Sequence, residues 1–114
     1  AAALTMVATV AMAAVLAMYP NVYVDVAALS APFVVGREGY LRYLRQLVED
    51  GFGKRILFGT DFPSEVDRGV RLILEAGFLS AEQKSDILCG NAVRFLKLEA
   101  SVCAVSPPPV GLQR

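Results

Sequence analysis

The apolar residues of the chain change their spacing from one block to the next, and each block predicts one element. Residues 1–18 carry no charge, and their apolar side chains point in nearly all directions at 100° per residue. A helix that is apolar all round lies in a protein core or in lipid. We expect a buried helix that Pro20 ends, with a membrane or secretory segment as the alternative, although residues 1–18 contain no basic region.

Two further blocks predict β-strands. Residues 22–27 are rich in β-branched and aromatic side chains and follow a Pro-Asn turn signal. Residues 55–60 show no alternation of apolar and polar positions, which is typical of a strand covered on both faces in a parallel sheet. A loop is expected between the strands over residues 28–37, where Ser, Pro and Gly interrupt the pattern.

Apolar residues at helical spacing predict four helices after the first strand. The first of these is expected to end at Gly51. Ser80 and Gln83 have the spacing of a capping box, which opens a helix. Gly90 is expected to end that helix and Asn91 to cap the last one. These helices are predicted over residues 40–48, 65–75, 81–89 and 92–98.

The alternation of helix, strand, helix and strand, followed by further helices, predicts an α/β fold with a parallel sheet. Two strands seldom make a stable sheet alone. Hydrophobic residues make up 55% of the 114 residues, above the ~45–50% of ordinary soluble domains. We therefore expect apolar faces that need neighbours. We divide this single domain into residues 1–18 (the Ala-rich helix), 19–98 and 99–114 (a mobile tail with three consecutive prolines).

Charge and residue types exclude several function classes. Eleven basic and eleven acidic residues give a formal net charge of zero, so the chain has no general attraction to nucleic acid. The absence of histidine excludes Ser–His–Asp and Cys–His centres and His-ligated metal sites within this chain alone. Cys89 and Cys103 fit neither a zinc knuckle nor a disulfide framework, and we expect free thiols in the cytoplasm.

The second predicted strand and the loop after it are the most informative stretch for chemistry. The strand runs directly into Asp61, and ligands of α/β folds bind at the carboxyl ends of the strands. Gly59 permits close approach of backbone or ligand, and Pro63 stiffens the loop. Asp61 is therefore a candidate general base or metal ligand, and the alternative is that it caps the following helix or turn.

Three motifs, in this order, resemble the C-terminal part of the amidohydrolase-related family. They are YPNVYVD at Tyr19–Asp25, RILFGTDFP at Arg55–Pro63, and the stretch at Leu79–Leu98 that contains ILCGNAVRFL. The resemblance covers residues 19–98. Members of this family are TIM-barrel, metal-dependent hydrolases and decarboxylases. The resemblance implies a partial (β/α)8 barrel, made of the last two βα units plus C-terminal helices, with residues 22–27 and 55–60 as the seventh and eighth strands.

The same resemblance implies that Asp61 lies beside a divalent metal ion, expected to be Zn²⁺, and helps to activate the bound water or the substrate. The implied reaction is hydrolysis of a small carboxylate, amide or ester-type substrate, or decarboxylation of a small acid. The family's histidine ligands are missing from this chain. We therefore expect an inactive fragment that binds no metal alone and needs the remaining barrel segment or a homo-oligomer.

Other polar positions are weaker candidates, and a structural role is expected for each. Asp25 is expected to be a structural polar group of its strand, and Asn91 a helix cap. Glu65 is expected to face the helix dipole rather than to act as a second carboxylate for Asp61. A solvated helix face is expected for the basic cluster of Arg37, Arg42 and Arg45.

Two rival functions remain open from the sequence. The first is a non-catalytic interaction module that folds by self-association, because the predicted apolar faces exceed what the chain can cover. The second is a membrane-tethered fragment with residues 1–18 in lipid. The family resemblance favours the enzyme, and membrane attachment is the least favoured of the three.

Overall fold

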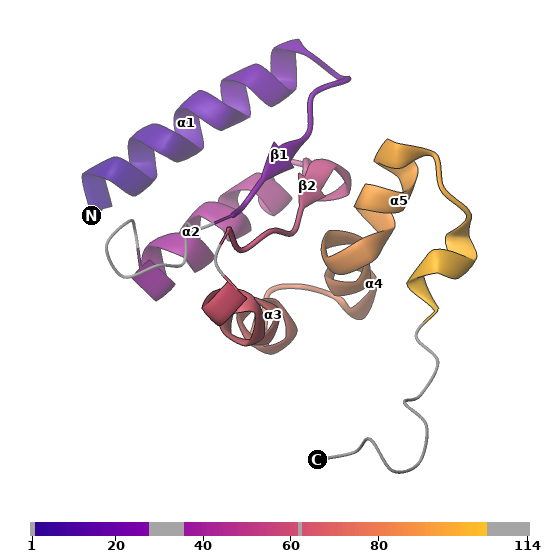
Figure 1. Ribbon diagram of the computed structural model, residues 1–114. Coiled ribbons are helices and arrows are strands. Elements are labelled where there is room, and N and C mark those ends of the chain that lie inside the picture. Colours follow the sequence, from indigo (N-terminus) through magenta and orange to yellow (C-terminus); the bar gives the residue numbers. More distant parts are fainter. Residues whose placement is uncertain (1, 28–35, 62, 105–114) are drawn as a thin grey trace.

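Two short parallel strands surrounded by helices form the fold of the chain, seen in the computed structural model of Figure 1. The structure describes residues 2–27, 36–61 and 63–104. Strand β1 (Val24–Asp25) pairs with β2 (Ile56–Leu57), with Val24 opposite Ile56 and Asp25 opposite Leu57. Helix α2 (Gly36–Glu49) lies between them in the chain. The predicted α/β class with parallel strands is thus confirmed as a helix-rich α/β fold with a two-stranded sheet.

Both strands are shorter than the predicted ranges 22–27 and 55–60. A residue counts as strand only where its backbone groups bond to a neighbouring strand, and each strand has one neighbour among the described residues. The first residue of the second range, Arg55, belongs to a 3₁₀ turn, Gly53–Arg55. The apolar pattern therefore predicted where the strands lie, and each strand is short because it has a single neighbouring strand among the described residues.

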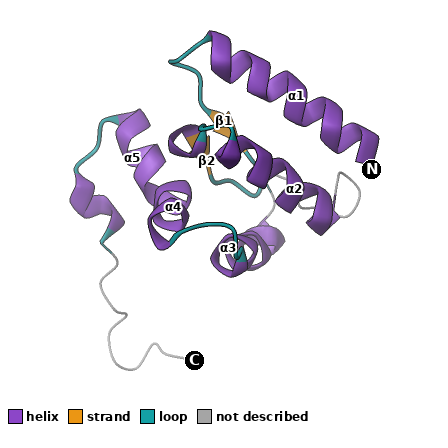
Figure 2. Cartoon of the chain, turned by 180° about the vertical axis from the view of Figure 1, so that it is seen from behind, coloured by secondary structure: helices purple, strands orange, loops and turns teal. Residues whose placement is uncertain are grey.

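Helix α1 (Ala2–Met18) runs beside α2, as Figures 1 and 2 show from opposite sides. The predicted helix is confirmed, but the expectation that it is buried is wrong for this chain. Among its described side chains only Thr9 and Leu16 are buried, whereas Met6, Val7 and Val10 are about two-thirds exposed. α1 packs mainly against α2, which leaves its other side uncovered. In the described ranges, no helix is both long and apolar enough to cross a bilayer.

The C-terminal helices form one nearly continuous helical stretch after α3 (Val66–Glu75). Helix α4 (Ala81–Ser85) begins at the predicted capping box of Ser80 and Gln83, which is confirmed in both directions. A π-helical turn (Asp86–Gly90) leads straight into α5 (Asn91–Leu96). The prediction that Gly90 ends a helix and Asn91 caps the next is wrong, because both residues keep right-handed helical backbone angles.

The buried core joins α1, α2, both strands, α3 and the π-turn. Its apolar side chains come from every one of these elements, so no single pair of elements forms a separate core. Helix α2 turns one face towards this core and buries Tyr40, Leu44 and Leu47 there, as their spacing predicted. The largest fully buried apolar side chains are Tyr40, Leu16, Leu44, Leu47, Ile56, Ile73, Ile87 and Val26.

A disulfide joins Cys89 of the π-turn to Cys103, so the expected free thiols are wrong. The chain reverses at Lys97, whose left-handed backbone (φ 56°) ends α5. The 3₁₀ segment Ala100–Cys103 then returns to the π-turn, with the two cysteine Cα atoms 5.8 Å apart. The expected cytoplasmic location rested on free thiols and loses that support. The predicted loop at 28–37 and tail at 99–114 lie largely outside the described residues.

Candidate functional site

The carboxyl ends of β1 and β2 lie at the same edge of the sheet because the strands are parallel. At this carboxyl edge, Asp25 ends β1, and the chain passes from β2 through Gly59 to Asp61. Asp61 is exposed and has a left-handed backbone (φ 65°), a conformation that Asp adopts more readily than most residues. It turns the chain towards the 3₁₀ segment Pro63–Glu65. The N-cap position of α3 is Glu65, so Asp61 does not cap that helix.

Helix α2 packs against the carboxyl edge through Tyr40. Burial and, secondarily, the negative charge of Asp25 raise the pKa of the Tyr40 phenol above its ordinary value. Asp25 Oδ1 accepts a hydrogen bond from the Ala27 backbone N–H at 2.5 Å, which closes a turn after β1. A Cβ atom added at Gly59 would lie 2.8 Å from Asp25 Oδ1. Gly59 therefore allows the end of β2 to approach the Asp25 carboxylate.

Helix α3 packs against the same edge through Gly69. A Cβ atom at Gly69 would lie 3.1 Å from the Phe58 ring and 3.3 Å from Thr60 Cγ2. The first turn of α3 thus lies directly on the residues that follow β2. Beside it, a cavity of about 300 Å³ lies between the beginning of α2 and one face of α3, along which its lining runs from Asp67 to Glu75. Its lining residues are Arg37, Asp67, Arg68, Arg71, Leu72 and Glu75.

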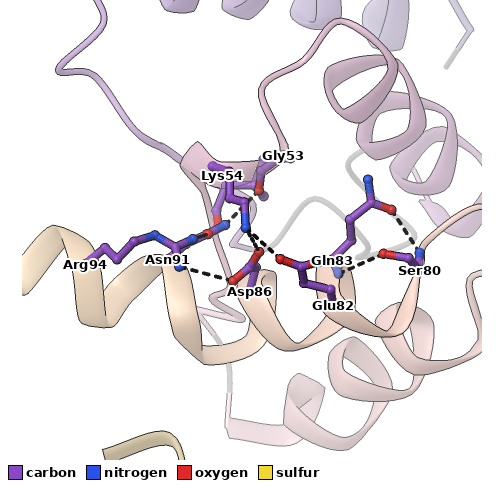
Figure 3. Close-up of polar contacts among 9 residues, drawn as sticks. Gly53, Lys54, Ser80, Glu82, Gln83, Asp86, Asn91 and Arg94 are labelled. Atoms are coloured by element: carbon purple, nitrogen blue, oxygen red, sulfur yellow. Dashed lines mark hydrogen bonds and ion pairs between the residues drawn. The ribbon is translucent and has the colours of Figure 1, made fainter. Parts of the chain in front are cut away.

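The amino edge of the sheet carries a different kind of polar cluster, drawn in Figure 3. Asn91 is fully buried, and its Nδ2 donates to the Gly53 carbonyl at 2.8 Å and to the Ile56 carbonyl at 2.7 Å. Its Oδ1 accepts a hydrogen bond from Arg94. Asn91 therefore attaches the start of α5 to the entrance of β2, and its role is to hold the fold rather than to cap a helix.

Asp86 is the charged centre of this amino-edge cluster. Its carboxylate accepts from Lys54 Nζ at 2.6 Å and from Arg94 Nη1 at 3.2 Å. Burial acts to raise the pKa of Asp86, but the hydrogen bonds from Lys54 and Arg94 outweigh it and hold the pKa below its ordinary value. Lys54 also reaches Glu82 at 3.2 Å.

A backbone hydrogen bond joins the π-turn to the residue after β2. The Phe58 backbone N–H donates to the Ile87 carbonyl of the π-turn at 3.2 Å.

Arg55 binds one carbonyl in the last turn of α1 and two carbonyls that follow the helix. Its guanidinium donates to the Leu16 carbonyl at 2.6 Å, the Tyr19 carbonyl at 2.9 Å and the Val22 carbonyl at 3.0 Å. The last carbonyls of a helix have no partner within the helix, and a cation complements the negative end of its dipole. α1 has no basic residue in its own last turn, so a residue 36 positions beyond Tyr19 supplies that charge.

Two of the other sequence-predicted positions, Glu65 and Arg45, pair with neighbours in the chain. Glu65 pairs with Arg68 at 3.4 Å, at the start of α3. Arg42 and Arg45 are exposed on α2, and Arg45 lies 3.9 Å from Glu49 and over the Phe78 ring, as expected for a solvated face. Spacing along the sequence carries no signal for the roles of Asn91 and Arg55, because the backbone carbonyls to which they donate lie at least 33 positions away.

The described residues do not fit the zinc centre that the family resemblance implies. Zinc sites use three or four protein ligands. Among the residues that the structure describes, no group of three or more His, Cys, Asp and Glu is placed to hold a metal ion. Asp61 is one carboxylate at the carboxyl edge, and any further ligands have to come from outside these residues.

Comparison with known proteins gives one result. No curated protein and no solved structure matches the chain. A family model described as Amidohydrolase matches residues 3–98, which is most of the chain and includes helix α1. The motifs at β1, β2 and the π-turn all lie inside that match. On this match the chain belongs to the amidohydrolase family.

Proposed function

We propose that this chain forms the last two βα units and the C-terminal helices of a (β/α)8-barrel hydrolase. The reaction is hydrolysis of a C–N or C–O bond in a small carboxylate, amide or ester-type substrate. The observation that carries the proposal is the amidohydrolase match over residues 3–98, combined with an exposed Asp61 at the carboxyl edge. Active sites of (β/α)8 barrels are built at that edge.

The incomplete sheet supports the need for a further barrel segment. β1 and β2 pair only with each other in the described part of the chain, so each has one edge without a strand. Open edges of a sheet expose unpaired N–H and C=O groups that a further strand can satisfy. The Ile56 carbonyl of β2 and the Phe58 N–H after it already bond to Asn91 and to Ile87, so this argument applies to β1. The remaining barrel segment is therefore the proposed partner, and we expect the 114-residue chain alone to have no turnover.

Asp61 is the residue that we propose at the reacting centre. Its carboxylate is exposed, and the left-handed backbone at this position turns the chain sharply as it leaves β2. A carboxylate in this place is suited to accept a proton from the attacking water and to return it to the leaving group. Because the described residues do not form a metal site, the role of Asp61 as a metal ligand stays a prediction that depends on ligands from elsewhere.

Turnover by the natural polypeptide that carries these residues tests the proposal. The purified protein is assayed against a panel of small amides, esters and lactones, and Asp61→Asn is compared with the parent protein. We expect kcat/KM to fall by at least about 100-fold, because general acid–base catalysis contributes roughly 10²–10⁴-fold. Asp50→Asn is the matched control, since Asp50 is an exposed carboxylate at the far end of α2.

Two results would contradict the proposal. One is full activity in Asp61→Asn, which would remove the residue from the reacting centre. The other is no turnover of any compound in the panel. The same panel includes small carboxylic acids monitored for CO₂ release, because decarboxylation is the alternative reaction of the family. CO₂ release without hydrolysis would replace the hydrolase by a decarboxylase.

A second candidate function is a self-associating module without catalysis. It is favoured by the uncovered side of α1, where Met6, Val7, Val10 and Met18 are each about two-thirds exposed. Exposed apolar faces of this kind mark interaction surfaces. Light scattering after size exclusion tests it: a discrete oligomer of the 114-residue chain that Val7→Glu dissociates favours the module, and a monomer contradicts it.

A further inference from the structure

The cavity between α2 and α3 is lined by three arginines from two elements. Arg37 comes from the beginning of α2, and Arg68 and Arg71 from α3. Two acidic residues of α3, Asp67 and Glu75, also line it, so the charged lining has a net charge of +1. Guanidinium groups bind carboxylate and phosphate through paired N–H donors. The lining therefore has the chemistry of a site for a small anion.

This cavity lies between the two helices that pack against the carboxyl edge of the sheet, and its lining comes from these helices alone. Arg37 lies one helical turn before Tyr40 in α2. The negative charge of Asp25 helps to raise the pKa of the Tyr40 phenol. Arg68 and Arg71 lie on the same helix as Gly69, where an added Cβ atom would meet Phe58 and Thr60 at the exit of β2. The helices that pack against the carboxyl edge thus also carry the arginines.

The three arginines differ in whether they already form an ion pair within the chain. Arg68 is held by Glu65 at 3.4 Å. Arg37 and Arg71 are exposed, and neither forms an ion pair with another described residue within 4.0 Å. Asp67 and Glu75 lie one turn before and one turn after Arg71, on the same face of α3. Arg37 and Arg71 are the two guanidinium groups that a ligand can engage.

We infer that this cavity binds the carboxylate of a small monoanionic ligand through Arg37 and Arg71, with Leu72 in contact with its apolar part. A single net positive charge matches one carboxylate. Asp67 and Glu75 would repel a phosphate dianion, which carries more charge than the lining balances. A volume of about 300 Å³ lies at the lower end of small-molecule sites and suits a small acid. Binding of the acid is independent of the proposed function. Only the identification of the bound acid as the substrate rests on it.

Titration of the 114-residue chain with benzoate, followed by NMR of the arginine Nε–H groups, tests the site. We expect benzoate to shift the Arg37 and Arg71 signals with saturation. Arg71→Gln is expected to raise the dissociation constant about tenfold or more, since a charge-assisted hydrogen bond contributes ~1.5–3 kcal/mol. Arg45→Gln is the matched control, because Arg45 is an exposed arginine of α2 outside this cavity.

Benzamide and inorganic phosphate complete the experiment. Benzamide has the shape of benzoate without its charge, and equal binding of both would overturn recognition of a carboxylate. Tighter binding of phosphate than of benzoate would overturn the choice of a monocarboxylate. Absence of benzoate binding, or equal binding by Arg71→Gln and the parent, would overturn the site itself. None of these readouts needs turnover, so the site can fail while the hydrolase proposal stands, and the reverse.

Discussion

The two edges of the small sheet use charged residues in opposite ways. At the amino edge, Asn91, Asp86 and Arg55 all bond to other parts of the chain and are wholly or partly buried. At the carboxyl edge, Asp61 is exposed where the chain leaves β2, and Arg71 is exposed in the cavity between α2 and α3. Polar groups that satisfy one another hold a fold together, whereas exposed charged groups beside a cavity can bind a ligand. We therefore assign stability to the amino edge and chemistry to the carboxyl edge.

The largest expected effect is a loss of stability when Asn91 at the amino edge is replaced. Asn91→Ala removes both hydrogen bonds to the Gly53 and Ile56 carbonyls and leaves these acceptors without their partner. We expect the free energy of unfolding to fall by about 3 kcal/mol, measured by urea denaturation. Asn21→Ala, at an exposed asparagine, should change it by less than about 0.5 kcal/mol. Equal effects of the two substitutions would contradict the role given to Asn91.

The next effect concerns the disulfide between Cys89 and Cys103. The bond closes a loop of modest length, with a sequence separation of 14, and its removal should cost about 2 kcal/mol. The measurement is urea denaturation with and without dithiothreitol. The reductant should destabilise the parent protein and leave Cys103→Ser unchanged. A parent protein that is insensitive to reductant would show that the disulfide contributes nothing to stability.

A smaller, pH-dependent effect is expected from Asp86. Its folded-state pKa is held below the unfolded value of about 3.9, so its contribution to stability is present above that pH. The contribution is lost as the pH falls through the folded-state pKa. Unfolding free energies measured from pH 6 to pH 2 should therefore fall more steeply for the parent than for Asp86→Asn. Ser85→Ala, at an exposed neighbour, should keep the parent's slope, and identical slopes for Asp86→Asn would contradict the account.

The smallest stability effect is expected at the carboxyl edge. Asp61→Asn and Arg71→Gln each alter an exposed side chain, so the free energy of unfolding should change by less than about 0.5 kcal/mol. The same urea denaturation measures it. A loss as large as that of Asn91→Ala at either position would remove the contrast between the two edges.

Local patterns in the sequence were enough to predict most elements of the fold. Helical spacing predicted α2 from Tyr40 onward, and the capping box at Ser80 predicted the start of α4, because both depend on neighbours in the chain. Parallel strands were predicted from the order of elements and because apolar and polar residues do not alternate around Ile56, and the structure confirms them. The position of Asp61 at the carboxyl edge followed for the same reason.

The errors arose where distant contacts decide the local structure. Asn91 looked like a cap because it follows Gly90, but its side chain bonds to residues 35 and 38 positions earlier, within a continuous helical stretch. Cys89 and Cys103 meet only because the chain reverses at Lys97. Spacing along the sequence carries no information on such contacts. The exposed side of α1 was misjudged for a related reason, since its apolar composition does not say which element covers it.

The central claim is that β1 and β2 form the end of a larger catalytic barrel, and the intact mass of the natural polypeptide tests it most directly. A (β/α)8 barrel typically has ~250 residues. We predict a single polypeptide that contains these residues and whose mass is well above the 12.2 kDa of this chain. A natural polypeptide of 12.2 kDa would contradict the claim, because the strands needed to complete the barrel would not be present in the same molecule.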